Sequence, residues 1–307
     1  MSVIVLGTMA FDAIETPFGK IDKVVGGSAT YVAYAASQLV KPIKQLSIVG
    51  NDFPDEEMAE LKKRGVELEG VQIIPDQKSF FWSGKYHLDM NTRDTLITDL
   101  NVLADFKPVV PDSYQDAEFL MLGNLMPELQ KSVINQLKKR PKLIVLDTMN
   151  FWMETALDSL KEVIGMIDVL MINDSEARQL SNEFSLVKAA KVILAMGPKY
   201  LIIKKGEHGA LLFHDNHVFF APALPLEDVF DPTGAGDTFA GGFIGHLART
   251  KDISFENMKT AIIVGSAMAS FCVEKFGPQR LKEITKADID IRLGEFVQLV
   301  NFDIDLV

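Results

Sequence analysis

The stretch that most constrains the fold is residues 231–242, "DPTGAGDTFAGG". It places Gly234, Ala235, Gly236 and then Asp237 where the apolar run that follows, "FAGGFIGHLA", predicts the start of a helix. A helix N-terminus presents free backbone N–H groups and positive dipole character, so it suits an anion, and glycine lets the backbone come close to that anion. A carboxylate beside an anion site is mildly repulsive, which predicts a chemical role for Asp237. The alternative is a first-turn acid that stabilises the helix dipole by about 0.3–1 kcal/mol.

Outward from this turn, short β-branched runs alternate with segments of helical period. The runs are "SVIVLG", "QLSIVG", "EFLMLG", "KLIVLD" and "DVLMIN". Strands that are apolar throughout predict burial on both faces, as in a parallel sheet covered by helices. The alternation therefore predicts an open, doubly wound α/β sandwich. After "KYLIIKK", the segment "ALLFHDNHVFFA" predicts an antiparallel hairpin, followed by long helices over about 236–249 and 254–274.

Two stretches, residues 13–25 and 71–101, break this alternation. Both have alternating strand character and no intervening helix. We interpret them together as a small sheet beside the main sandwich, a candidate lid inserted in one domain that spans residues 1–307. The alternative is an ordinary β-meander at the edge of the main sheet.

The composition limits the location and the partners of the chain. A net charge of −11 over 307 residues, with no lysine- or arginine-rich run, argues against nucleic acid and anionic membranes as partners. One cysteine, Cys272, cannot form an internal disulfide and fits a reducing compartment. The start "MSVIVLGTMAFD" indicates a first strand and not a signal peptide, and no apolar run reaches the roughly 18–20 residues of a membrane span. We expect a soluble cytoplasmic protein.

Several known catalytic motifs do not occur. The chain has no G-x-x-x-x-G-K-[ST], no G-x-G-x-x-G after its first strand, no G-x-S-x-G and no H-E-x-x-H. Instead, "DPTGAGDTFAGGF" resembles the C-terminal signature of the PfkB, or ribokinase-like, family of sugar and nucleoside kinases. Further matches in the expected order are "GTMAFD" (7–12), "GGSATYVAYAA" (26–36), "NDSE" (173–176) and "KKGEHGALL" (204–212). The resemblance implies a ribokinase-like fold: a doubly wound, mainly parallel sheet between helices, with a small β-sheet lid.

The resemblance also implies an activity: ATP- and Mg²⁺-dependent phosphorylation of an alcohol, expected to be a primary CH₂OH, on a sugar or nucleoside. The backbone of Gly234, Ala235 and Gly236 would form an anion hole for the transferring phosphoryl group, and Asp237 would be the general base. Phosphoryl transfer depends mainly on positioning and charge stabilisation, and a well-placed base typically adds about 10²–10⁴-fold.

On the nucleotide side, Asn173 and Glu176 have the spacing of a capping box. In the family, this N-x-x-E motif organises Mg²⁺, often through water, and both roles can hold together. "KKGEHG" is compatible with a plain hairpin turn, whereas the family pattern T-x-G-x-x-G at this place contacts nucleotide phosphates; Lys204 replaces the threonine. The nucleotide contacts implied by the resemblance are Asn173, Lys204, Gly206, Gly209, Thr233, Gly265, Ser270 and Gly277, with Asp231 facing a monovalent cation such as K⁺.

On the acceptor side, Asp12 matches the family aspartate that accepts hydrogen bonds from substrate hydroxyls, although a turn or capping role is an alternative. Gly26 and Gly27 match a glycine turn that approaches the sugar, and Tyr31 replaces the usual asparagine of that motif. Further acceptor candidates are Trp82, Asn91 and Arg93 of the lid, if they face the cleft, and Asn150 after a core strand.

Two alternatives to a sugar kinase remain open. Tyr31 and the aromatic lid residues favour a nucleoside or another substituted acceptor. A non-catalytic sugar- or nucleotide-binding regulatory protein on the same fold is the alternative from another class, although the intact Asp237 argues against it. The expected quaternary state is a monomer or a homodimer that pairs through the lid.

Overall fold

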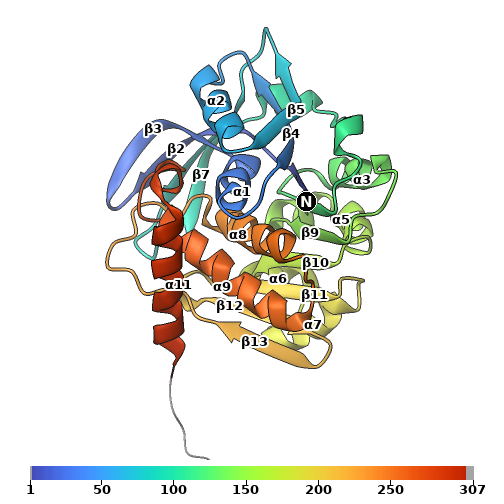
Figure 1. Cartoon of the computed structure of the whole chain (residues 1–307), viewed down its shortest axis with the longest axis vertical. Coiled ribbons are helices and arrows are strands. Elements are labelled where there is room, and N and C mark those ends of the chain that lie inside the picture. Colours follow the sequence, from blue (N-terminus) through green and yellow to red (C-terminus); the bar gives the residue numbers. More distant parts are fainter. Residues whose placement is uncertain (1, 302–307) are drawn as a thin grey trace, which may run out of the picture.

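The computed structural model describes residues 2–301, and its centre is a nine-stranded sheet in the order β13-β12-β11-β10-β9-β8-β1-β4-β5 (Figure 1). Neighbouring strands are parallel from β5 to β11, β12 pairs antiparallel with β11, and β12 and β13 form the predicted antiparallel hairpin. The strands are β1 (Val3–Leu6), β4 (Ile43–Gly50), β5 (Val66–Ile74), β8 (Phe119–Leu122), β9 (Leu143–Asp147), β10 (Val169–Asn173), β11 (Tyr200–Lys204), β12 (Ala210–His214) and β13 (His217–Ala221). The doubly wound sheet predicted from the continuous apolar runs is confirmed.

Helices cover both faces of this sheet and enclose two separate apolar clusters. One face carries α1 (Ser28–Ser37), α2 (Asp55–Lys63), α8 (Ala235–Thr250), α9 (Phe255–Cys272), α10 (Gln279–Glu283) and α11 (Lys286–Val300). The other carries α3 (Pro127–Gln136), α4 (Asn150–Thr155), α5 (Leu157–Ile164), α6 (Asp174–Ser181) and α7 (Leu186–Leu194). The two long helices that follow the glycine-rich turn are present as α8 and α9, as expected.

The glycines inside α8 explain how it occupies the middle of its layer. A Cβ on Gly241 would lie 2.7 Å from the carbonyl oxygen of Val32 in α1, and one on Gly242 would lie 3.0 Å from the Cα of Gly265 in α9. Each interior glycine costs a helix roughly 1 kcal/mol relative to alanine. Here that cost allows three helices to pack with their backbones nearly in contact, which fixes the N-terminus of α8 relative to the sheet.

A separate four-stranded sheet, in the order β3-β2-β6-β7, forms the lid at the upper left of Figure 1. Its strands are β2 (Ala10–Thr16), β3 (Gly19–Gly26), β6 (Phe80–Tyr86) and β7 (Arg93–Asp99). The second sheet expected from the sequence therefore exists, but its bounds differ. Residues 71–74 belong to β5 and pair with β4 in the main sheet. As an edge strand, β5 is buried on one side only, so its sequence alternates like that of a lid strand.

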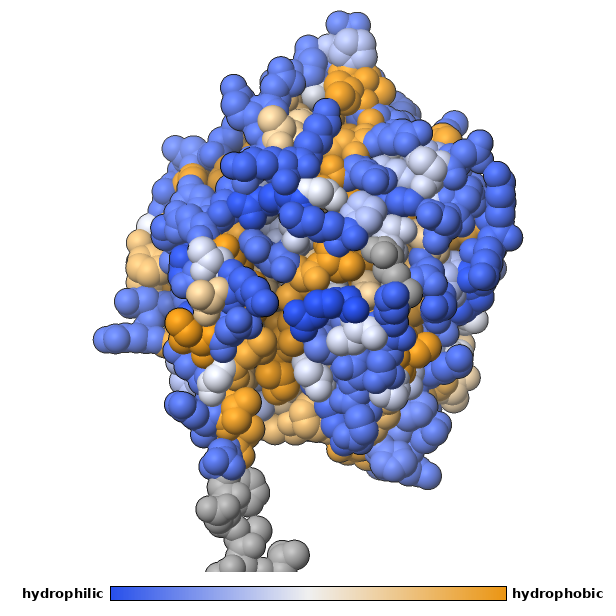
Figure 2. All heavy atoms as spheres, viewed as in Figure 1, coloured by the Kyte–Doolittle hydropathy of each residue, from blue (hydrophilic) through white to orange (hydrophobic). Residues whose placement is uncertain are grey.

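Within residues 2–301, no helix is both long and apolar enough to cross a bilayer. The face that carries α9 and α11 is mostly hydrophilic, with apolar side chains visible in the furrows between the elements (Figure 2).

Candidate active site

The glycine-rich stretch forms a turn of five residues, Thr233 to Asp237, which we call the anion turn. Gly234 has φ 76° and ψ 0° and is the N-cap of α8. The N–H of Ala235 donates to the carbonyl of Pro232 at 3.2 Å. Within residues 2–301, the N–H groups of Gly234, Gly236 and Asp237 have no backbone acceptor outside the helix, as expected for the first turn. Of the three amides predicted for the anion hole, that of Ala235 is therefore already hydrogen-bonded, whereas those of Gly234 and Gly236, and also that of Asp237, are available.

Two buried residues hold the anion turn in place. The side chain of Tyr31, in α1, is 1% exposed, and a Cβ on Gly234 would lie 2.4 Å from its ring. Asp231 accepts hydrogen bonds from the N–H of Thr233 and from that of Gly277, both at 2.8 Å. The ring of Tyr31, which we expected to contact the acceptor, packs beneath the turn, and its buried hydroxyl has no hydrogen-bond partner within residues 2–301.

Asp237 is the third residue of α8 and lies among several charges. Burial and the neighbouring carboxylate of Asp147 raise its pKa to about 7, while Lys204 and Arg93 oppose this shift. A carboxylate with a pKa near neutrality is well matched to general-base catalysis at physiological pH. The position beside free N–H groups and the raised pKa together suit Asp237 to accept a proton from an attacking hydroxyl.

The acceptor side of the site is centred on Asp12, in β2. Burial, Asp231 and Asp237 raise the pKa of Asp12 to about 8, and the N–H of Gly27 opposes the shift. A Cβ on Gly26 would lie 1.9 Å from the carboxylate oxygen Oδ2 of Asp12, so only glycine fits there. Gly27 has φ 91°, a conformation that favours glycine. The two glycines predicted to approach the acceptor therefore frame Asp12.

The lid candidates take different positions. Trp82 pairs with Asp12 in the register of β2 and β6, and its ring lies 5.8 Å from the guanidinium carbon of Arg93. Asn91 lies against the nucleotide-side turn, because a Cβ on Gly206 would be 2.4 Å from its side-chain oxygen. Asn150, the first residue of α4, is exposed. Trp82 is thus next to Asp12 along the lid sheet, Arg93 acts on the charge of Asp237, and Asn91 is on the nucleotide side.

The "NDSE" motif forms the capping box that its spacing predicts. Asn173 Oδ1 accepts from the N–H of Glu176 at 2.8 Å, and Glu176 Oε2 accepts from the N–H of Asn173 at 2.7 Å. Burial and Asp147 raise the pKa of Glu176 to about 7, and Lys204 is among the groups that oppose the shift. The cap uses one oxygen of Glu176, which leaves Oε1 for a cation or its water ligand.

The turn after β11 contains Gly206 and Gly209, with φ values of 55° and 82°. Both values fall in the left-handed region that favours glycine, which explains their positions. Lys204 ends β11, and its Nζ lies 2.6 Å from Oδ2 of Asp147.

Three of the residues expected near the adenine are used in packing. Gly265 is buried where α8 crosses α9, since a Cβ there would lie 2.8 Å from the carbonyl oxygen of Phe239. Ser270 is buried, donates to the carbonyl of Ala267 and accepts from Arg292 of α11. Gly277 holds Asp231, and a Cβ on it would meet Val24 of the lid at 2.6 Å. Helix packing and the lid contact account for these residues, so the structure gives no support for a base contact by Gly265 or Ser270.

Sequence reasoning missed two residues of the site, Tyr86 and Asp147. The hydroxyl of Thr233 donates to the hydroxyl oxygen of Tyr86 at 3.2 Å, and this bond joins the lid to the anion turn. Burial raises the pKa of Tyr86 to about 12. Asp147 ends β9 at the carboxyl edge of the sheet, where ligands bind in doubly wound folds. The sequence signal for Asp147 was its position at the end of the apolar run in "KLIVLDTMN". Tyr86 had no sequence signal beyond its place in the predicted lid.

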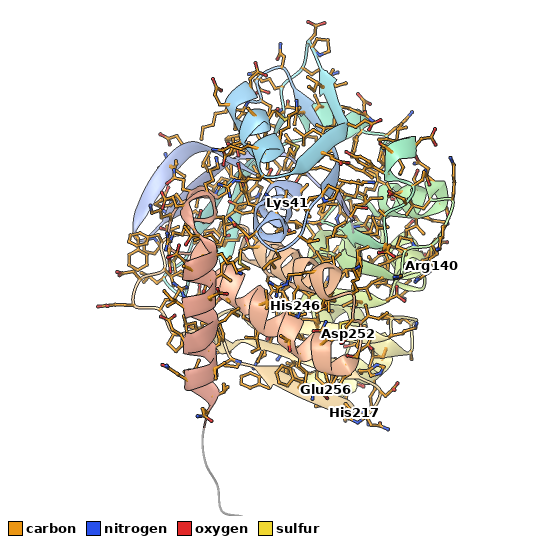
Figure 3. The ribbon with its side chains drawn as sticks, viewed as in Figure 1. Lys41, Arg140, His217, His246, Asp252 and Glu256 are labelled. Carbon is orange, nitrogen blue, oxygen red and sulfur yellow. The ribbon has the colours of Figure 1, made fainter. Side chains whose placement is uncertain are left out.

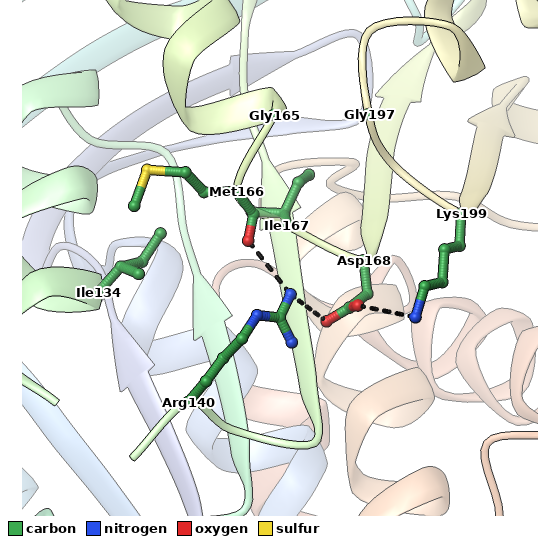
Figure 4. A pocket seen from close by; sticks show the side chains of 8 residues that line it. All are labelled: Ile134, Arg140, Gly165, Met166, Ile167, Asp168, Gly197 and Lys199. Atoms are coloured by element: carbon green, nitrogen blue, oxygen red, sulfur yellow. Dashed lines mark hydrogen bonds and ion pairs between the residues drawn. The ribbon is translucent and has the colours of Figure 1, made fainter. Parts of the chain in front are cut away.

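Two histidines away from the candidate active site have structural partners. His246, in α8, lies 2.9 Å from Asn257 Oδ1, and His217 packs against Phe255 (Figure 3). A surface pocket of about 480 Å³ lies where Arg140 meets Asp168 at 2.9 Å (Figure 4). Asp168 also accepts from the N–H of Ile144 and immediately precedes β10. This pocket is therefore at the amino ends of the strands, opposite the anion turn.

The fold and this geometry define a class of protein: a phosphotransferase that acts on small molecules, with an anion turn at a helix N-terminus and an adjacent base. The chain matches the model of the pfkB family of carbohydrate kinases over residues 2–285, and it belongs to that family. It is therefore a kinase, as the motifs implied.

Individual relatives support the same fold and family. A cytidine kinase from Thermococcus kodakarensis is 28% identical over 259 residues, which are 82% of this chain and 91% of that protein. A nucleoside kinase from Burkholderia thailandensis, solved with inosine, superposes with a TM-score of 0.74 at 21% identity, covering 98% of this chain and 99% of that one. A putative ribokinase II from E. coli, solved with ATP and Mg²⁺, has a TM-score of 0.78 at 21% identity and covers 97% and 99%.

Proposed function

We propose that this kinase transfers the γ-phosphoryl group of ATP to a primary CH₂OH of a nucleoside or sugar, with Asp237 as the general base. The observation that carries the proposal is the position of Asp237: it combines a pKa raised to about 7 with a place directly after the free amides of the anion turn. In the proposed reaction, Asp237 accepts the hydroxyl proton, the hydroxyl oxygen bonds to phosphorus, and ADP leaves. The amides of Gly234, Gly236 and Asp237 stabilise the charge on the transferring group.

We infer that the acceptor is a nucleoside. Trp82 lies in register with Asp12, so a hydroxylated ring bound at Asp12 would have an aromatic neighbour for a base. The cytidine kinase and the inosine-bound nucleoside kinase support this choice, whereas the putative ribokinase II keeps a simple sugar as the second candidate. A regulatory protein that binds these ligands without turnover is the candidate from another class.

The residues present fit Mg²⁺ held mainly by the nucleotide. Within residues 2–301, no three His, Cys, Asp or Glu side chains gather as a metal site of their own. Mg²⁺ usually keeps several waters and takes one or two carboxylates plus substrate phosphates, and the buried Glu176 beside Asp147 suits that arrangement. The ion would supply positive charge to the phosphates. Both oxygens of Asp231, the candidate K⁺ ligand, already accept hydrogen bonds from N–H groups. We therefore expect K⁺ to increase kcat only modestly.

The exposed strand β7 is the proposed contact with a second copy of the chain. It is the edge of the lid sheet, and Leu96 and Ile97 are 57% and 46% exposed on it. An unpaired edge with apolar side chains is a template for pairing with another strand. We expect a homodimer by sedimentation and a monomer for Ile97→Lys. We also place the enzyme in the cytoplasm, where ATP is available.

An ADP-release screen across nucleosides and sugars, with Mg²⁺ and with or without K⁺, tests the proposed function. We expect turnover with one or more nucleosides at rates well above those with free sugars. Turnover with a sugar alone would overturn the nucleoside assignment but keep the kinase. If no acceptor supports ADP release although ATP and a nucleoside bind, the regulatory alternative is correct.

A further inference from the structure

A buried ammonium group borders the anion turn. Nζ of Lys204 lies 3.1 Å from the point that a Cβ on Gly236 would occupy, so it is beside the middle of the turn. It also lies 2.6 Å from Oδ2 of Asp147, and the two side chains are only 18% and 8% exposed. Lys204 comes from β11 and Asp147 from β9, so the pair spans the carboxyl end of β10, which lies between them.

The ammonium has hydrogen-bonding capacity to spare. Lysine carries three donors and no acceptor, and within residues 2–301 only Asp147 accepts from Lys204. Burying a charged group is costly unless its donors are satisfied. A ligand with several oxygens at this point would satisfy the two remaining donors. Burial lowers the pKa of Lys204, but Asp147, Glu176 and Asp237 together raise it above its ordinary value.

We propose that Lys204 donates to the γ-phosphoryl group as it moves from ATP to the acceptor, and that Asp147 is the positioning residue that aims its ammonium. This inference rests on the proposed function. Nζ lies beside Gly236, one residue before the base Asp237, and this position favours the terminal phosphate over an inner one. That is where the transferring group must lie if the amides of the turn bind it.

The chemical step balances without a change in Lys204. The acceptor oxygen bonds to the γ-phosphorus, the bond from that phosphorus to the β,γ-bridging oxygen breaks, and the hydroxyl proton passes to Asp237. Lys204 stays protonated throughout and keeps its ion pair with Asp147. Lys204 contributes a positive charge, held in place by Asp147, in a site sheltered from water, where such groups are most effective.

The first test compares affinities for ADP and for the non-hydrolysable ATP analogue AMP-PNP, measured by calorimetry with Mg²⁺. For Lys204→Met, we expect a loss of about tenfold or more for AMP-PNP and less than about threefold for ADP, because only the analogue has a terminal phosphate. The kcat should fall by about 10²–10³-fold, the range found when one such donor is removed. Lys204→Arg should recover part of both losses.

Lys205→Met is the matched control. Lys205 is the next residue, is partly buried in the same turn, and has no side-chain hydrogen bond or ion pair within residues 2–301. We expect both affinities and kcat to stay within about twofold of the wild-type values. A loss in this variant equal to that of Lys204→Met would show that the general charge of the turn is responsible, and it would overturn the proposal.

A double-mutant cycle tests the role of Asp147. Asp147→Asn should lower kcat by about tenfold or more, but only a small further loss is expected when it is added to Lys204→Met, because Asp147 acts through Lys204. Thermal melts report folding; if Lys204→Met alone is unstable, the double variant removes the unpaired acid and serves in its place. Independent, additive losses in kcat would contradict the positioning role.

The outcomes separate this proposal from the proposed function. If the wild-type protein binds no ATP, the proposed function fails first. If it binds and turns over ATP, and folded Lys204→Met keeps its AMP-PNP affinity and kcat within about threefold, the phosphoryl role of Lys204 is wrong. Equal losses for AMP-PNP and ADP would also overturn it, because they would place the ammonium at the inner phosphates.

Discussion

Replacing Gly234, the N-cap of α8, with alanine should destabilise the protein. The φ of 76° at Gly234 costs an L-residue about 1–2 kcal/mol. In Gly234→Ala, the new Cβ would lie 2.4 Å from the ring of Tyr31, whereas ordinary contacts are 3.4–4 Å, so the turn or the ring must move by about 1 Å. Overpacking in a core adds about 1–3 kcal/mol. We therefore expect the free energy of unfolding to fall by about 2–5 kcal/mol.

The same displacement should impair catalysis. A misplacement of about 1 Å can cost about 10²-fold in rate, so kcat for Gly234→Ala should fall by about that factor. Urea denaturation and steady-state kinetics measure the two effects. Gly294→Ala is the control: Gly294 lies in α11 with nothing within 4 Å of a Cβ, so alanine should stabilise the protein by roughly 0.5–1 kcal/mol and leave kcat unchanged. Wild-type stability and turnover in Gly234→Ala would refute the packing of Tyr31 beneath the turn.

Three further predictions concern the acids and the lid. Because the base must be ionised, kcat should rise with pH and level off above the pKa of about 7 for Asp237; a pH–rate profile that is flat from 5 to 8 would contradict this. Asp12 has a folded-state pKa of about 8 against an ordinary 3.8, so the folded protein binds the extra proton and loses stability as pH rises from about 4 to 8. The free energy of unfolding of Asp12→Asn should therefore rise relative to that of the wild type as pH increases, by at most about 6 kcal/mol at pH 8. Urea denaturation of both proteins at pH 5 and pH 8 measures this difference, and a difference that does not change with pH would show that the carboxylate is solvated. Tyr86→Phe removes the bond to Thr233 and should raise the acceptor KM several-fold with little change in melting temperature; an unchanged KM would mean that this bond does not hold the lid.

Most of the fold followed from local sequence patterns. Apolar runs such as "KLIVLD" became the buried strands of the parallel sheet, and "FAGGFIGHLA" became α8. The error in the lid bounds arose at β5, because an edge strand of the main sheet alternates in the same way as a lid strand. The alternation of apolar and polar residues does not indicate which sheet an edge strand joins.

The site was predictable where chemistry depends on local backbone, and less so where it depends on distant contacts. The anion turn and the capping box of Asn173 and Glu176 form within a few residues, so their spacing was sufficient. Tyr31 occupies a motif position associated with substrate, yet it packs under a turn about 200 residues later in the chain. The pairing of Lys204 with Asp147, and the contact of Tyr86 with Thr233, are set by tertiary packing alone.

Turnover by Asp237→Asn tests the central claim most directly, namely that this acid accepts the proton of the attacking hydroxyl. The substitution preserves shape, so the melting temperature should hold and AMP-PNP should bind within about threefold of wild type. We expect kcat with the identified acceptor to fall by at least about 10²-fold, in line with the loss of a general base. If the folded variant binds AMP-PNP and still turns over at a near-normal rate, Asp237 is not the base and the mechanism proposed for this site is wrong.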